Sequence, residues 1–159
     1  MTDRWEYLVS YPYTVRHRIA EHFVAEHKHV VDVGTYKLTL KPSPEQTVTC
    51  IDPLQTVEGF DGSFSQWWGH HNTFTGFALV ILGCAIEGSR HEWDCVTQAA
   101  KQADMIVLEW ATDYVSPFGD PSLLMVGYNT LFHSRMVFPH LGTPGFKEYN
   151  NRIMMVGTK

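Results

Sequence analysis

The chain has 159 residues, 44% of them hydrophobic, and a formal net charge of −5 at pH 7. This length predicts one domain, residues 1–159, with residues 1–28 as a helical segment packed on it. The acidic balance and the lack of a basic block argue against a nucleic-acid partner, while a homo-oligomer stays open. The longest apolar run, Phe77 to Cys84, is too short to span a membrane, and the polar opening residues are not those of a signal peptide. We therefore expect a soluble, cytoplasmic protein.

Hydrophobic periodicity predicts helices that alternate with short strands. The predicted helices are 13–26, 92–102 and 122–132, and the predicted strands are 30–33, 47–51, 77–82, 105–110, 135–139 and 152–156. Residues 65–68 are a further short-strand candidate. Alternating strands and helices indicate a mostly parallel α/β sheet with helices on both faces. The last two strands lack a convincing helix between them, which predicts an antiparallel C-terminal hairpin at one edge.

The first two strands end in residues that are typical of nucleoside-binding α/β proteins. Asp32, Val33 and Gly34 close the first strand, and Asp52 follows the second strand, 18 residues after Gly34. In such folds a glycine turn lies against the ligand, and an acid about 20 residues later binds the ribose hydroxyls. The alternative is an ordinary strand end with a turn. The spacing favours a ligand site at the carboxyl ends of parallel strands.

With these motifs the chain resembles the class I S-adenosylmethionine-dependent methyltransferases, as a trimmed member with a Rossmann-like sheet. Val31 to Gly34 matches the start of the family's glycine loop, and Ile51 to Pro53 matches the acid after its second strand. The resemblance implies S-adenosylmethionine as cofactor. It further implies a cofactor site made of Asp32, Gly34, Thr35, Asp52, Pro53, Asp61, Gly62 and Gly83. Asp61 and Gly62 would border the adenine, although Asp-Gly also predicts a plain turn.

Three departures from the family pattern bear on the ligand and on activity. Tyr36 and Leu38 occupy the second and third glycine positions of the loop, and Ala78 stands where an Asp is common. The connections around the second strand are also too short for full helices. A dinucleotide pyrophosphate needs the close backbone approach that glycines allow, so the sequence favours adenosylmethionine over NAD.

His70 and His71 are the predicted general bases, because imidazole titrates near neutral pH. With Trp67 and Trp68 they would form a pocket wall; surface histidines and packed tryptophans are the alternative. Glu109 lies inside an apolar strand and requires a partner there.

No metal site is predicted, because the histidines and the three cysteines lack a recognised ligand spacing. We expect a methyltransferase that acts on a small molecule. The alternatives are a non-catalytic methyltransferase-like partner module and an enzyme that cleaves S-adenosylmethionine.

Overall fold

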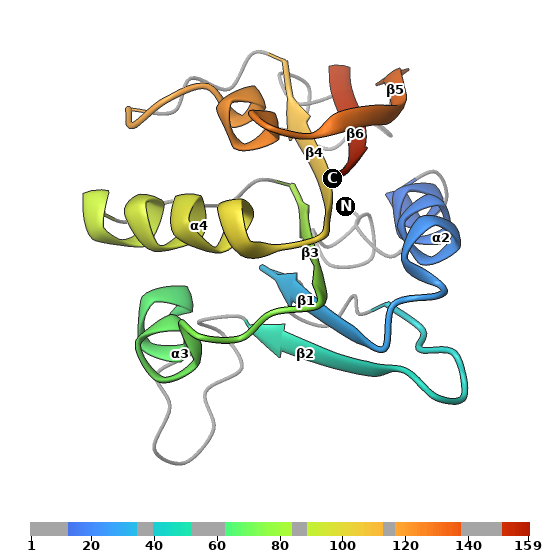
Figure 1. Ribbon diagram of the computed structural model, residues 1–159. Helices are drawn as coiled ribbons and strands as arrows, with labels where there is room; N and C mark the ends of the chain where they lie inside the picture. The colour runs from blue at the N-terminus through green and yellow to red at the C-terminus, as the bar shows by residue number, and fades with distance from the viewer. Residues whose placement is uncertain (1–12, 35–39, 52–62, 84–88, 113–116, 138–150) are drawn as a thin grey trace, which may run out of the picture.

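The computed structural model describes residues 13–34, 40–51, 63–83, 89–112, 117–137 and 151–159. These residues form three layers, in which a six-stranded sheet lies between α2 on one face and α3, α4 and the 3₁₀ helix η1 on the other (Figure 1). The elements in chain order are α2 (Tyr13–Val24), β1 (His29–Val33), β2 (Thr47–Ile51), α3 (Phe64–His71), β3 (Phe77–Leu82), α4 (Arg90–Gln102), β4 (Met105–Ala111), η1 (Pro121–Met125), β5 (Asn129–Val137) and β6 (Asn151–Thr158).

The sheet has the strand order β2-β1-β3-β4-β6-β5. Strands β2, β1, β3 and β4 are parallel, whereas β6 pairs antiparallel with both β4 and β5. The mostly parallel sheet with an antiparallel C-terminal strand pair is therefore confirmed. The parallel strands bring the carboxyl ends of β1, β2, β3 and β4 to one edge, where open α/β sheets bind their ligands.

Two hydrophobic clusters cover the two faces of the sheet. On one face, alternate residues of β1, β3 and β4 pack against Phe64 and Trp68 of α3 and against α4 and η1. On the other face, the intervening residues pack against Ala20 and Val24 of α2. Strand β3 is buried on both faces, which explains its continuous apolar sequence.

Two sequence predictions of secondary structure are wrong. Residues 65–68 belong to helix α3, whose first turn is capped by the Ser63 hydroxyl and whose buried Phe64 and Trp68 have helical spacing. Residues 122–132 do not form one helix, because η1 ends at Met125 and Gly127 adopts a left-handed φ of 90°. Strand β5 begins directly after this turn.

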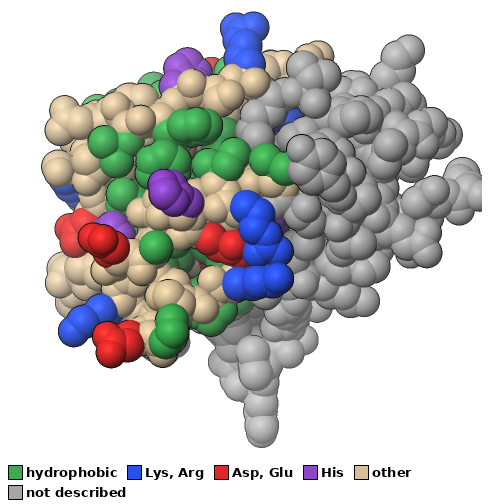
Figure 2. Space-filling view, turned by 90° about the vertical axis from the view of Figure 1, so that its right-hand side faces the viewer, with side chains coloured by type: hydrophobic (Ala, Val, Ile, Leu, Met, Phe, Trp, Pro, Cys, Tyr) green, Lys and Arg blue, Asp and Glu red, His purple; other side chains and the backbone are tan. Residues whose placement is uncertain are grey.

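The outer face of α2 carries side chains that are only partly covered, and Figure 2 shows hydrophobic side chains gathered on this side of the molecule. A shallow hollow of about 420 Å³ is lined by Val15, Arg18, Ile19, His22, Phe23 and Phe132. Within the described ranges, no helix has both the length and the apolar character needed to cross a bilayer.

Candidate functional site

Two glycines end neighbouring strands at the carboxyl edge of the sheet. Gly34 follows β1 with a φ of 79°, and Gly83 follows β3 with a φ of 84°. L-residues rarely adopt this left-handed conformation, so both positions favour glycine. The Gly34 N–H donates to the Ile51 carbonyl at 2.7 Å and thereby joins the ends of β1 and β2. The sequence prediction that Gly34 and Gly83 lie at one edge thus agrees with the geometry.

Asp32 is a buried carboxylate beside this edge. Its neighbours Val31 and Val33 pack in the cluster under α3 and α4, so Asp32 faces the α2 side of the sheet. Its side chain is fully buried, and neither carboxylate oxygen has a hydrogen-bond partner within the described part of the chain. Burial raises the pKa of Asp32 to about 7, although the backbone of Leu40 and the charge of Arg16 oppose the rise.

Glu109 on β4 is the second buried carboxylate on this face, and it has several partners. It accepts from Arg16 Nη1 at 2.6 Å, from Arg152 Nη1 at 3.1 Å and from the Gly83 N–H at 2.7 Å. Burial by itself would raise the pKa of Glu109, but the two guanidinium charges and these bonds outweigh it and lower the pKa. Glu109 is therefore ionised at neutral pH, and it joins α2, β3 and β6 at the candidate site.

The first turns of α3 and α4 lie at the same end of the molecule. The Ser63 hydroxyl accepts from Gln66 N–H, and the Ser89 hydroxyl accepts from Glu92 N–H at 3.1 Å. The Glu92 carboxylate also accepts from the Ser65 N–H at 3.0 Å, which ties the two helix starts together. Both helices therefore point their partially positive N-termini towards the carboxyl edge of the sheet.

Five of the eight predicted cofactor residues fall outside the described ranges. Asp52 and Pro53 come directly after the last residue of β2, and Thr35 follows Gly34. Together with Asp61 and Gly62, their roles stay predictions.

The structure places His70 and His71 at the opposite end of the sheet. They form the last turn of α3 and are exposed. Phe74, three residues after His71, shows which end of the sheet this is. Its ring packs against His29, the first residue of β1, and against Phe77, the first residue of β3. The two histidines are thus not brought together with Gly34 and Gly83.

The two neighbouring tryptophans pack rather than line that edge. Trp68 is 2% exposed and donates from its indole to Gln98 at 3.1 Å, and Trp67 stacks on His71 with ring centroids 4.6 Å apart. The predicted extended wall is replaced by a helix because alternate burial does not fit these residues, whereas a spacing of four does.

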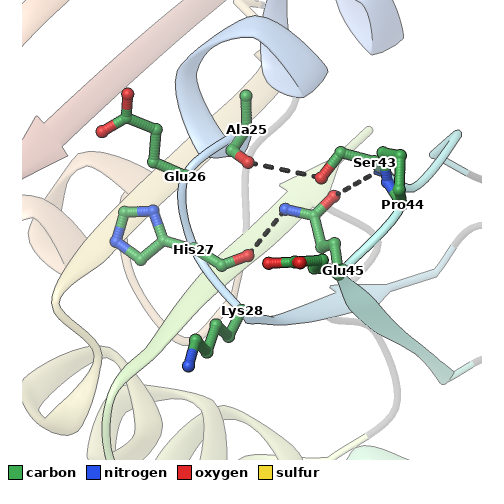
Figure 3. Close-up of a pocket in the computed structure, with 8 residues that line it drawn as sticks. Ala25, Glu26, His27, Lys28, Ser43, Pro44 and Glu45 are labelled. Atoms are coloured by element: carbon green, nitrogen blue, oxygen red, sulfur yellow. Dashed lines mark hydrogen bonds between the residues drawn. The ribbon is translucent and has the colours of Figure 1, made fainter.

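A second hollow, of about 480 Å³, also lies away from the carboxyl edge, where α2 ends and β2 begins (Figure 3). Gln46 explains its shape: the side-chain amide donates to the carbonyls of Val24 and His27 at 2.8 Å, and its oxygen accepts from the Ser43 N–H. These bonds satisfy carbonyls at the end of α2, so the contacts have a structural purpose.

Metal-binding groups do not gather in the described ranges, where no three His, Cys, Asp or Glu side chains lie together. Cys95 has only a weak contact with His91, at 3.9 Å, and burial together with nearby Glu92 and Asp94 raises the pKa of its thiol. A raised thiol pKa disfavours the nucleophilic thiolate.

Sequence reasoning missed Arg16 and Arg152 as part of this site. The signal that existed was Glu109 in an apolar strand, whose need for a partner is confirmed. Nothing in the local sequence indicated which cations would meet it, because Arg16 lies 93 residues away.

Comparisons with known proteins give structural likenesses only. No protein-family model matches the chain, and no curated protein matches it. A protein from Streptococcus mutans, assigned provisionally as a SAM-dependent methyltransferase, matches 91% of the chain at 9% identity with a TM-score of 0.53. TehB from Haemophilus influenzae matches 97% at 11% identity, also with a TM-score of 0.53. EvdMO1 matches 91% at 14% identity with a TM-score of 0.45.

The chain spans 48% of the length of the S. mutans protein, 66% of TehB and 40% of EvdMO1. At these identities the first two likenesses establish the fold alone. The chain therefore has a Rossmann-like α/β fold.

Proposed function

We propose that the protein is an S-adenosylmethionine-dependent methyltransferase that binds its cofactor at the carboxyl ends of β1, β2 and β3. The observation that carries the proposal is Asp32, a buried carboxylate without a described partner, directly before the left-handed Gly34. Burying an unpaired charge is costly, so such a group is typical of a functional site. Adenosylmethionine carries an ammonium and a sulfonium, either of which complements a carboxylate.

The proposed roles divide among the strand ends. Asp32 would receive the ammonium of the methionine portion, and the Gly34 turn would lie against that portion. Asp52 would bind the ribose hydroxyls from the end of β2, as its place in the sequence predicts. The chemistry then needs alignment more than a dedicated catalytic group, because the sulfonium already makes the methyl group electrophilic.

We propose a small molecule as the methyl acceptor. The supporting observations are the net charge of −5 and the absence of a basic block in the sequence. For a weakly nucleophilic acceptor a base is required, and His70 and His71 were the sequence candidates. Because they lie at the other end of the sheet, we do not assign them this role.

Calorimetric titration tests the proposal. We expect adenosylmethionine and adenosylhomocysteine to bind with one site per chain, and NAD, the matched control, not to bind. Failure of both adenosyl ligands to bind would overturn the proposal. Binding without product formation across acceptor panels would favour a non-catalytic module, which the Tyr36 and Leu38 positions also suit. Consumption of adenosylmethionine without an acceptor would identify a cleaving enzyme.

A further inference from the structure

Arg16 lies within electrostatic range of both buried carboxylates but bonds to only one of them. Its Nη1 is 2.6 Å from Glu109 Oε2, while its charge merely lowers the pKa of Asp32. Asp32 itself has no hydrogen-bond partner within the described ranges. Asp32 is registered with Val80 of β3 and Glu109 with Leu82 of the same strand, so the two carboxylates flank β3 on the face that α2 covers, where the guanidinium of Arg16 lies. The carboxylate that pairs with Arg16 therefore decides which one stays open.

Glu109 holds Arg16 in a buried ion pair that has further hydrogen-bond partners. The carboxylate also accepts from Arg152 and from the Gly83 N–H, so two guanidinium groups and a backbone N–H stabilise its charge. The side chains of Arg16 and Arg152 are each 10% exposed, and that of Glu109 is 0% exposed. Breaking a pair buried this deeply leaves an uncompensated charge, so Arg16 does not leave Glu109 readily.

We propose that Glu109 is a positioning residue that keeps Arg16 away from Asp32, so that the Asp32 carboxylate stays available to the ammonium group of the ligand. This inference rests on the proposed function for the identity of the ligand. Without Glu109, Arg16 would pair with Asp32 and occupy the place of the ligand's cation. The Glu109 carboxylate also accepts from the Gly83 N–H, and it thereby fixes the turn after β3.

The binding test uses adenosylhomocysteine at pH 8. Glu109→Gln keeps the shape of the side chain but removes its charge. We expect this variant to bind about 10- to 100-fold more weakly, because the ligand's ammonium group loses one charge-assisted hydrogen bond to Asp32. In the double variant R16Q/E109Q the competing cation is gone, and the affinity should return to near that of the wild type.

If Glu109 had a purely structural role, the double variant would bind adenosylhomocysteine no better than Glu109→Gln does. Met105→Ala is the matched control: it removes a buried side chain at the amino end of the same strand, far from the network. It should lower the melting temperature without changing affinity. If Glu109→Gln does not fold, Glu109→Asp replaces it, since it withdraws the carboxylate by one methylene.

A second measurement needs no ligand: the titration of the Asp32 carboxyl group followed by carbon NMR. The buried charged or titratable side chains on the described elements around Asp32 are Arg16 and His17 of α2, Glu109 of β4 and Arg152 of β6, and the half-buried Cys50 of β2 is registered beside it in the sheet. We expect the Asp32 midpoint to fall in Glu109→Gln. We also expect its rise from Glu109→Gln to R16Q/E109Q to exceed its rise from the wild type to Arg16→Gln, because only a guanidinium that has moved onto Asp32 lowers its pKa more strongly.

Each outcome supports or overturns a stated part of the inference. An unchanged Asp32 midpoint in Glu109→Gln, or a double variant that does not regain affinity, overturns the positioning role. If the midpoints shift as expected but the wild type binds no adenosylhomocysteine, the positioning of Arg16 stands and the proposed ligand fails.

Discussion

Replacing Asp32 with Asn should stabilise the ligand-free protein while it weakens ligand binding. The amide resembles the protonated carboxyl in shape, and the difference lies in the charge. Burial raises the pKa of Asp32 from 3.8 to about 7. The folded protein therefore holds this proton more tightly than the unfolded chain does, so ionising Asp32 destabilises the fold.

The sign and size of the effect follow from these two pKa values. Below the unfolded value of 3.8 both states are protonated, and Asp32 costs nothing. The cost grows as the pH rises to about 7 and is constant above that. One pKa unit corresponds to about 1.4 kcal/mol, so the full cost is about 4 kcal/mol. For a chain of this size, removing it should raise the melting temperature by roughly 10 °C.

Thermal unfolding followed by circular dichroism from pH 4 to pH 8.5 measures this effect. The gain of Asp32→Asn over the wild type should be small near pH 4 and largest above pH 7. Asp94→Asn is the control, because the Asp94 side chain is 54% exposed and should change stability by less than about 0.5 kcal/mol. Adenosylhomocysteine should bind the Asp32→Asn variant about 10- to 100-fold more weakly. A variant that is less stable than the wild type at pH 8 would show that Asp32 is paired in the folded protein, and our reasoning about it would fail.

Three further predictions concern packing and the far end of the sheet. Gly157→Ala should destabilise the protein by about 1–3 kcal/mol in urea unfolding, because a Cβ there would meet Met125 Cε at 2.6 Å and Tyr128 Cβ at 2.8 Å. Gly69→Ala is the control: it lies in open space on α3 and should instead stabilise the protein by up to about 1 kcal/mol. Equal effects of the two substitutions would contradict the close packing around Gly157. Tyr128→Phe should cost about 1 kcal/mol by the same measurement, since its hydroxyl lies in hydrogen-bond range of two carbonyls at the end of α4; no loss would show that water replaces those contacts. His71→Ala should leave the calorimetric affinity for adenosylhomocysteine unchanged, and a weaker affinity would put α3's last turn at the ligand.

Sequence reasoning succeeded where a short pattern decides the structure. The strands β1, β2, β3 and β4 were predicted nearly to the residue, because each is a continuous apolar or β-branched run. The order of these strands with the helices between them was enough for the parallel sheet. Gly34 and Gly83 were also placed at one edge, since consecutive parallel strands bring their carboxyl ends together.

The sequence predictions fail where contacts between distant segments decide the structure. Trp67 and Trp68 were interpreted as an extended segment, although the burial of Phe64 and Trp68 against α4 makes them helical. The start of β5, residues 129–132, was interpreted as the end of a helix, because its pairing with β6 leaves no local pattern, whereas residues 135–137 were interpreted correctly as strand. Arg16 could not be matched to Glu109 from sequence, since an ion pair between distant segments leaves no local pattern.

The place of β6 has a consequence for the order in which the protein assembles. Strand β5 is synthesised before β6, yet in the finished sheet it touches β4 only through β6. While the ribosome is still making the segment between them, β5 has no neighbour in the sheet to which it can hydrogen-bond. Arg152, which lies on β6, reaches Glu109 at the same late moment. Docking of one strand thus completes both the sheet and the set of groups that hold the buried Glu109 carboxylate. A nascent chain halted before residue 151 would therefore expose an unpaired strand edge to chaperones and proteases and would leave Glu109 with one of its two guanidinium partners.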